Sequence, residues 1–238
     1  LERTRPRLSS FGSRVEFIHG PFHALPEYAA KLGWNEVDGI LADLGVSSFQ
    51  LDEPERGFSF RMGGPLDMRM DPSIGMSAAD WVNSTSEEAM ADVFWQYGEE
   101  RHSRRIARHL CWRREEKRFE TTDDLSEEVR KAVPGGFRHM RIHPATRVFQ
   151  AIRIEVNQEL VELQTLLSVG PRLLSIGGRM IVLSYHSLED RLVKRAFRAL
   201  DGNGFHLPTK KVVVSSDEEI EANPRSRSAK LRVIERVS

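Results

Sequence analysis

The chain has 238 residues, of which 39% are apolar and 29% charged, a composition typical of one large globular domain or a domain carrying an insertion. No apolar run approaches the ~20 residues that span a bilayer, and the N-terminal segment lacks the apolar core of a secretory signal. We therefore expect no membrane partner. Cys111 is the only cysteine, which excludes a disulfide framework and fits a reducing compartment. The 35 basic and 35 acidic residues cancel, so only the local distribution of charge bears on nucleic-acid binding.

The first part of the chain has the pattern of a strand, a helix and a second strand. Residues 1–13 have the pattern of a helix end followed by a turn, and residues 14–19 alternate and are rich in β-formers. A proline at its start and a glycine past its end predict a helix over 26–32. A continuous apolar run predicts a strand over 37–43 that is buried on both faces. Together these elements predict a βαβ unit and a parallel pair of strands.

Asp43 ends the second predicted strand and is followed by a turn of small residues that includes Gly45, Ser47 and Ser48. In open α/β sheets, ligands bind beyond the carboxyl ends of the strands. Asp43 is therefore a candidate ligand-binding carboxylate. A turn-capping role for Asp43 explains this stretch equally well.

A long irregular segment and a group of helices follow. Residues 50–72 mix Gly, Pro, Arg, Asp and aromatic residues without a period, which predicts an ordered loop over the strand ends. Residues 73–145 have helical patterns and predict an inserted subdomain. The expected helices cover 77–82, 85–97, 99–116 and 121–133.

The last part of the chain returns to mixed patterns. Residues 145–168 carry one apolar stripe and predict a single long helix. The other expected elements are strands over 179–184, 210–215 and 230–237, a helix over 191–200 and a solvated acidic loop over 217–221. The whole pattern predicts an α/β fold with a parallel core and antiparallel strands at the C-terminal end.

Polar or aromatic residues follow three predicted strands: Phe22, Asp43 and the pair Tyr185-His186. At one rim of a sheet they suit a ligand with a flat ring and an amino group. The Gly-x-Gly-x-x-Gly and P-loop motifs of other nucleotide cofactors are absent. Ser187 lacks the Gly-x-Ser-x-Gly context of a nucleophile, and no metal site is expected because no ligand spacing matches one.

Basic residues cluster within and after the predicted helix 99–116, where several share one face at i, i+3, i+4 and i+7 spacing. A basic face on a neutral chain fits a nucleic-acid interface. A solvated helix face paired with acidic neighbours such as Glu99 and Glu100 fits equally well. The clustered residues are Arg101, Arg104, Arg105, Arg108, Arg113, Arg114, Lys117 and Arg118, followed by Arg138, Arg141, Arg147 and Arg153.

Long motifs along nearly the whole chain resemble the MraW-type methyltransferases of small-subunit (16S-type) ribosomal RNA, which act on cytosine N4. They include Asp-Leu-Gly-Val-Ser-Ser at 43–48 and His-Pro-Ala-Thr-Arg-Val-Phe-Gln-Ala-Ile-Arg at 143–153. The other matching segments are 50–52, 56–60, 64–71, 97–101, 184–191 and 223–228.

The resemblance implies a Rossmann-like, S-adenosylmethionine-dependent methyltransferase sheet with an inserted all-helical domain. It implies methylation of the N4 amino group of a cytosine in the decoding region of rRNA, within an assembled or late-assembly small ribosomal subunit. Residues 1–71 and 146–238 would form the methyltransferase domain, and 72–145 the RNA-recognition domain. A homodimer is an open alternative, and a bacterial cytoplasm is the expected location, with an organelle as the alternative.

By match to the family, Phe22, Asp43 and Gln50 would contact the cofactor. Asp43, Tyr185 and His186 are the catalytic candidates: Asp43 would accept hydrogen bonds from the reacting amino group, and the other two would hold or stack the target base. The residues expected to hold RNA phosphates are Arg105, Arg108, Arg147, Arg153, Arg225 and Arg227.

The family also has a glycine-rich loop after its first strand and an Asp that ends its second strand, and neither motif is found in this sequence. We therefore expect the sequence to be N-terminally incomplete and to lack part of the cofactor site. The alternative function is a catalytically inactive rRNA-binding or ribosome-assembly module.

Overall fold

The computed structural model describes residues 4–137 and 143–238 and divides the chain into two compact units. Unit 1 comprises the chain up to Leu44 together with Leu160–Ser238, and unit 2 comprises Gly45–Glu159. The compact insertion thus runs from 45 to 159 and is wider than the expected 72–145. The reason is that the irregular loop over 50–72 and the helix that begins at Ala145 pack into the helical core. The assignment of a separate function to each part stays a prediction.

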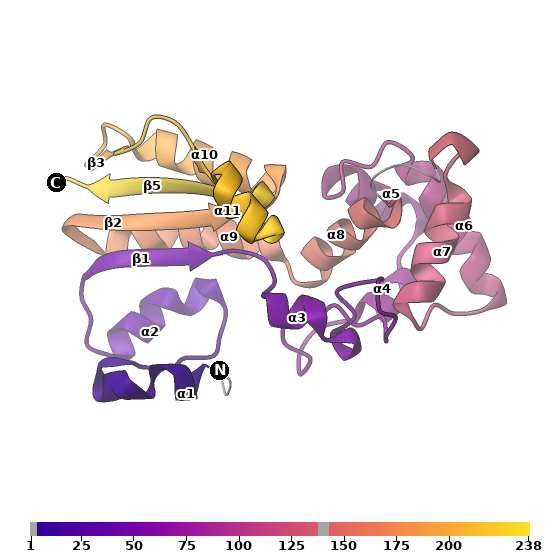
Figure 1. Ribbon diagram of the computed structural model, residues 1–238, viewed down its shortest axis with the longest axis horizontal. Helices are drawn as coiled ribbons and strands as arrows, with labels where there is room; N and C mark the ends of the chain where they lie inside the picture. Colours follow the sequence, from indigo (N-terminus) through magenta and orange to yellow (C-terminus); the bar gives the residue numbers. More distant parts are fainter. Residues whose placement is uncertain (1–3, 138–142) are drawn as a thin grey trace. The chain divides into compact units, whose positions relative to one another are not determined.

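Unit 1 contains a five-stranded mixed sheet in the order β1-β2-β5-β3, with β4 also paired to β5 (Figure 1). β1 and β2 are parallel, and the other pairs are antiparallel. This mixed sheet confirms the α/β class. The strands are β1 (Val37–Asp43), β2 (Leu174–Ser184), β3 (Phe205–His206), β4 (Val213–Val214) and β5 (Lys230–Arg236).

Helices α9 and α10 pack on one face of the sheet. Met180 and Ile234 are directly opposed on β2 and β5, and both belong to one buried cluster with Leu163 of α9 and Phe197 of α10. Alternation along the strands explains why one face of a largely antiparallel sheet takes the apolar residues. The helices of unit 1 are α1 (Arg5–Leu8), η1 (Ser9–Arg14), η2 (Phe22–Ala24), α2 (Leu25–Lys31), α9 (Glu159–Val169), η5 (Gly170–Leu173), α10 (Ser187–Leu200), α11 (Asp217–Ala222) and η6 (Pro224–Ser228).

Two strand predictions in unit 1 are wrong. Residues 15–19 form no strand, because no neighbouring segment pairs with them and β-propensity alone cannot supply a ladder. β1 is not buried on both faces: among the described residues it pairs only with β2, and Leu41 is 69% exposed. The parallel pair therefore joins β1 to β2, and the predicted pairing of 14–19 with β1 is absent from the described residues.

Unit 2 is a helical bundle around one apolar core. Phe94, Ile106, Leu125 and Ile152 come from four different helices and are each fully buried. The helices are α3 (Ser48–Asp52), η3 (Pro54–Arg56), α4 (Ala78–Ser84), α5 (Glu87–Gln96), α6 (Ser103–Glu116), α7 (Thr122–Ala132), η4 (Gly135–Phe137) and α8 (Ala145–Val156). This bundle confirms the inserted helical segment. Across the described residues of both units, no helix has the length and apolarity to cross a membrane.

The irregular segment after α3 is ordered, as expected, because its own side chains hold it. The guanidinium of Arg56 donates hydrogen bonds to the carbonyl oxygens of Arg69 (2.8 Å) and Met70 (3.0 Å). Asn157 at the end of α8 donates to the carbonyl of Met68 (2.8 Å) and accepts from the N–H of Met70 (2.6 Å). Met68 is fully buried although its φ is +61°, so these contacts fix a backbone conformation that L-residues rarely adopt.

The predicted single helix over 145–168 is two helices. It breaks at Asn157 and Gln158, where Gln158 takes a φ of +51° and the Asn157 side chain bonds the loop. The acidic segment predicted as a loop is instead helix α11, because the Ser216 side chain accepts the N–H of Glu219 and caps three acidic residues in the first turn.

Gly57 provides a test of how closely the loop packs. Its φ is +69°, and a Cβ there would lie 2.3 Å from the carbonyl oxygen of Pro65. Gly75 has a φ of +73° with nothing within 4 Å of its Cβ position. We expect Gly75→Ala to lower the free energy of unfolding by about 1–2 kcal/mol through left-handed strain alone. Gly57→Ala should cost about 1–3 kcal/mol more, because the backbone of the loop must move.

Urea unfolding followed by helical circular dichroism measures both variants. Equal destabilisation by the two substitutions would show that the loop yields freely, contrary to this packing.

Candidate active site

The parallel pairing of β1 with β2 brings Asp43 and Tyr185 together. Asp43 is in register with Leu183, and Tyr185 lies two residues beyond Leu183, on the same side of the strand. The Tyr185 hydroxyl donates a hydrogen bond to Asp43 Oδ1 at 2.7 Å. No described residue bonds Oδ2 of the exposed Asp43 carboxylate. One oxygen is thus oriented by the protein, and the other can accept a hydrogen bond from a ligand.

The pKa of Tyr185 is raised to about 12, first by burial of the phenol and then by the hydrogen bond to Asp43 and the negative charges of Asp43 and Glu189. Tyr185 is therefore a neutral donor at physiological pH. Its hydroxyl serves to fix the Asp43 carboxylate, and its ring remains available beside it.

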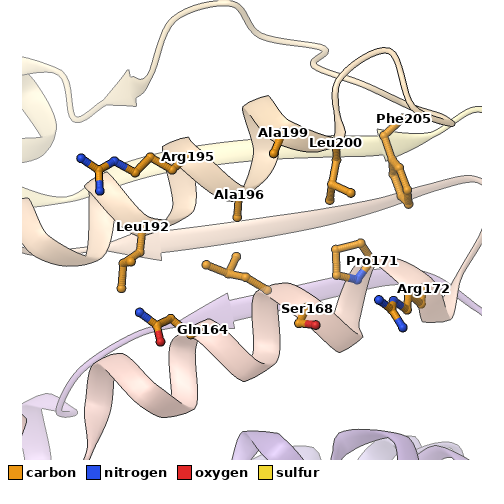
Figure 2. Close-up of a pocket in the computed structure, with 11 residues that line it drawn as sticks. Gln164, Ser168, Pro171, Arg172, Leu192, Arg195, Ala196, Ala199, Leu200 and Phe205 are labelled. Atoms are coloured by element: carbon orange, nitrogen blue, oxygen red, sulfur yellow. The ribbon is translucent and has the colours of Figure 1, made fainter.

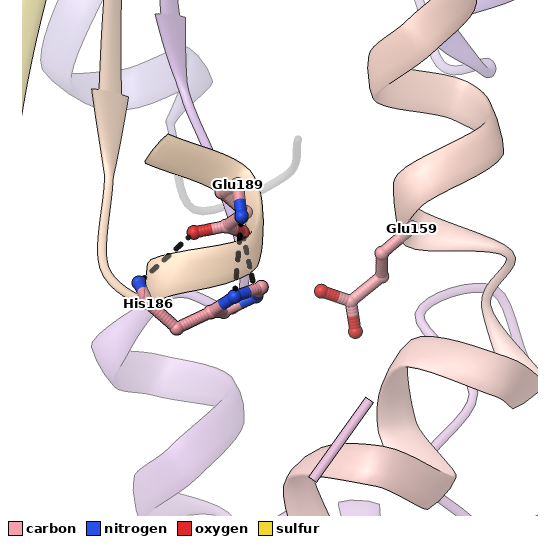
Figure 3. Close-up of side chains that lie close together, drawn as sticks. All are labelled: Glu159, His186 and Glu189. Carbon is pink, nitrogen blue, oxygen red and sulfur yellow. Dashed lines mark hydrogen bonds and ion pairs between the residues drawn. The ribbon is translucent and has the colours of Figure 1, made fainter. Parts of the chain in front are cut away.

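The turn after β2 is held by Glu189. Its Oε2 accepts the backbone N–H groups of Tyr185 (2.8 Å) and His186 (3.3 Å), and the carboxylate is almost completely buried. His186 caps α10 in return: its Nδ1 accepts the N–H of Glu189 at 3.4 Å, and its Nε2 lies 3.2 Å from Glu189 Oε1 (Figure 3). With only 10% of its side chain exposed, His186 is placed as a helix cap, which leaves little ring surface for stacking a base.

The predicted cofactor residues belong to both units. Phe22 lies in η2 of unit 1, and the residue is 40% exposed. The next residue, His23, anchors this turn to α9, since Glu162 accepts its N–H (3.1 Å) and lies 2.7 Å from its Nδ1. Gln50 lies in α3 of unit 2, where its Oε1 accepts the N–H (2.9 Å) and the hydroxyl (3.0 Å) of Ser47 in a capping box.

Several of the predicted RNA-binding arginines have protein partners. Arg153 forms a bidentate ion pair with Glu159 at 2.7 and 3.0 Å. Arg105 donates to the carbonyl of Ala132 at the end of α7 (2.6 Å), and Arg147 donates to the carbonyl of Glu99 (3.1 Å).

Other arginines of the set are more exposed. Arg108 pairs with Glu87 at 3.3 Å but is 75% exposed. Arg225 and Arg227 are exposed on η6 of unit 1. Arg101 lies before α6, which begins at Ser103, so the predicted stripe of four arginines is shorter by one. Arg138 and Arg141 lie outside the described residues.

Unit 1 also holds a pocket of about 490 Å³ between α9 and α10 (Figure 2). Its walls are mainly apolar and include Leu167, Pro171, Leu192 and Phe205. None of the predicted catalytic or cofactor residues lines it, and neither does any carboxylate. Its chemistry therefore does not fit a site that must bind amino groups, and the strand ends remain the better candidate.

The sequence profile of the MraW methylase family matches residues 1–237. This chain belongs to the MraW methylase family. A protein of Syntrophotalea carbinolica called "Ribosomal RNA small subunit methyltransferase H" is 51% identical over 253 residues, which cover 100% of this chain and 81% of that protein. The proteins of the same name from Sorangium cellulosum and Trichormus variabilis are 50% and 49% identical over 237 and 236 residues. These two alignments cover 100% and 99% of this chain, and 74% of each relative.

Membership confirms the fold class and the methyltransferase activity class that the motifs implied. The mixed sheet of unit 1 is the Rossmann-like methyltransferase sheet, and Asp43 and Tyr185 lie at the carboxyl ends of its parallel strands, where ligands of open α/β sheets bind.

Two residues that shape the site were not among the site residues predicted from sequence. Glu189 holds the turn that carries Tyr185, and the His-x-x-Glu spacing of a capping box was the available indication. Glu162 anchors the turn that carries Phe22, and nothing in the sequence indicates this contact, because it joins residues 139 positions apart.

The raised pKa of Tyr185 predicts a pH dependence. Because the folded pKa of about 12 exceeds the unfolded value near 10, the stability contribution of the neutral phenol is complete below about pH 10 and is lost as the pH rises from 10 toward 12. We expect Tyr185→Phe to flatten this loss in urea unfolding measured across that window. In ultraviolet titration of tyrosinate, Asp43→Asn should lower the pKa of Tyr185, because it removes the neighbouring negative charge.

As a control, the Tyr185→Phe variant should lack the tyrosine that ionises at high pH in the ultraviolet titration. A wild-type curve in which every tyrosine ionises near its ordinary value would contradict the hydrogen bond between Tyr185 and Asp43.

Proposed function

We propose that this protein transfers the methyl group of S-adenosylmethionine to the N4 amino group of a cytosine in the decoding region of small-subunit rRNA. The observation that carries the proposal is the exposed Asp43 carboxylate, oriented through one oxygen by Tyr185, at the sheet edge of a member of the MraW methylase family. The relatives' shared name, which specifies small-subunit ribosomal RNA, supports the substrate class. The substrate we propose is the assembled or late-assembly small subunit.

The residues at the strand ends fit the cofactor. Asp43 Oδ2 can accept hydrogen bonds from an amino group, and the exposed ring of Phe22 offers an apolar surface for a flat base. Gln50, which lies in unit 2, stays a predicted contact by its match to the family motif. S-adenosylmethionine, when bound, supplies an electrophilic methyl group, which is why no covalent intermediate with the protein is needed.

The protein's contribution is positioning and electrostatics. Cytosine N4 is a weak nucleophile because its lone pair is delocalised into the ring. Holding N4 in line with the methyl group supplies up to about 7–11 kcal/mol in well-aligned cases. We propose that Asp43 accepts a hydrogen bond from the amino group and stabilises the positive charge that develops on nitrogen. Tyr185 acts through Asp43 as a positioning residue and presents its ring to the base, while His186 maintains the turn that carries it.

We rank the arginines as RNA contacts by how exposed they are and by whether another residue of the protein already bonds them. Arg227 is exposed and has no ion pair within the part of the chain that is described, and Arg108 is exposed despite its contact with Glu87. We propose these two as phosphate contacts, and we add Arg225 on its exposure alone. Arg105, Arg147 and Arg153 would contact phosphate only by sharing or leaving their present partners.

The decisive test is Asp43→Ala. We expect it to lower turnover by at least about 10²-fold, the scale of losing one preorganised charge-stabilising contact, and to leave RNA affinity nearly unchanged. The matched control is Asp38→Ala, which removes a carboxylate from the opposite end of β1 that is bonded to Ser175 (2.9 Å); its turnover should equal wild type. Tyr185→Phe should lower turnover about two- to thirteenfold, the equivalent of one hydrogen bond of about 0.5–1.5 kcal/mol.

The measurement is mass spectrometry of N4-methylcytidine in nuclease digests of unmodified small subunits incubated with enzyme and cofactor. Normal turnover in Asp43→Ala would refute the role of Asp43. A wild-type protein that binds the subunits and produces no methylated cytidine would favour the alternative, an rRNA-binding or assembly module.

A further inference from the structure

Helix α10 carries a basic stripe on its outer face. Val193 and Phe197 are buried against the sheet, so the residues that alternate with them point away from it. Lys194, Arg195 and Arg198 recur at i, i+1 and i+4 on this outer side, and Arg195 and Arg198 are exposed. None of these three residues lies in a motif that identified the family.

A second segment brings two more cations to the same place. Lys210 and Lys211 lie between β3 and β4, and both strands pair with β5, which tethers the segment beside the sheet. Figure 1 shows β3 and α10 on the same side of β5. Lys194, Arg198, Lys210 and Lys211 all line one small hollow, and these four residues are called here the α10 basic surface.

The charges of the α10 basic surface are not neutralised by the protein. No carboxylate in the described ranges forms an ion pair with any of its four residues. Asp190 is occupied by Arg232 (2.7 Å) and Lys230 (3.4 Å). Asp201, at the end of α10, accepts the N–H of Leu207 at 3.2 Å. Because these four cations line the same hollow, their electrostatic potentials add there and attract an anion.

The size of the hollow decides which anion fits. It encloses about 20 Å³, room for roughly one water-sized group, whereas sites for small molecules enclose about 300–1,000 Å³. A free nucleotide therefore does not fit inside, but a phosphate group on an extended chain can lie across the rim. Long, flexible, unpaired Lys and Arg side chains are the usual contacts of a nucleic-acid backbone.

We infer that the α10 basic surface holds backbone phosphates of the substrate RNA, as a contact separate from the arginines of unit 2 and of η6. This inference rests on the proposed function for the identity of the RNA. The surface lies away from Asp43, on the outer face of a helix and a connecting segment, so it contributes to affinity and not to the chemical step.

The test is the salt dependence of binding to small-subunit rRNA, measured by filter binding. The variants Lys210→Gln/Lys211→Gln and Lys194→Gln/Arg198→Gln each remove two charges and keep most of each side chain. The matched control, Arg7→Gln/Lys31→Gln, removes two exposed cations that have no ion pair in the described residues. If each removed charge contacts one phosphate, the slope of log K against log salt falls by about 1.5 in each variant, at ~0.7–0.9 per phosphate.

Between about 50 and about 200 mM salt, the fold-loss of affinity should therefore be roughly eight times smaller in each variant than in wild type. The control should keep the wild-type slope. Methyl transfer at saturating RNA should keep its kcat in both variants while KM rises, a split that a misfolded protein would not give.

Slopes equal to the control in both variants would overturn the inference and leave the proposed methyl transfer intact. Loss of binding to phosphatidylserine vesicles without any change in RNA binding would also overturn it, in favour of a lipid surface. If RNA binding depends on the α10 basic surface as expected but no N4-methylcytidine forms, the proposed function alone would be refuted.

Discussion

The parallel pairing of β1 with β2 is the constraint on which the candidate site depends. The two strands are separated by all of unit 2 in the sequence, yet their register sets Asp43 beside Leu183. Only this register places the Tyr185 hydroxyl 2.7 Å from the Asp43 carboxylate. A slip of one residue would turn Tyr185 to the opposite face of the sheet. Burial of Met180 and Val182 on the helix-covered face prevents that slip, so the apolar core fixes the geometry of the polar rim.

The elements that sequence predicted well are those whose cause is local. β1 follows from a short apolar run that ends at Asp43, and α5 and α7 follow from a side-chain cap and a helical period. The errors have non-local causes. Residues 15–19 have strand composition but no pairing partner, and the stripe over 145–168 is interrupted because Asn157 bonds a loop that lies 89 residues earlier.

The partners of the charged residues were the least predictable feature, because a sequence gives the number of charges and not which groups they pair with. α6 is rich in arginine, but Arg105 and Arg114 donate to carbonyl oxygens at the ends of α7 and α4, and Arg113 lies 3.6 Å from the buried Glu128. These arginines hold the bundle together. Sequence analysis did not identify Lys194 and Arg198 of α10, because acidic residues lie near them in the sequence, yet no carboxylate of the described residues forms an ion pair with either of them.

Among the family motifs, residues whose polar groups are bonded within the fold have a structural role, and they differ from residues that can contact a ligand. Arg56 satisfies two loop carbonyls, Gln50 caps α3 and Glu189 holds the turn after β2. Each of these has its polar groups engaged by the fold, so its substitution would first disturb local structure. Asp43 differs because only one of its oxygens is engaged and its carboxylate is exposed. The second oxygen of Asp43 is left open to accept a hydrogen bond from a ligand, and this makes Asp43 the strongest candidate for the chemical step.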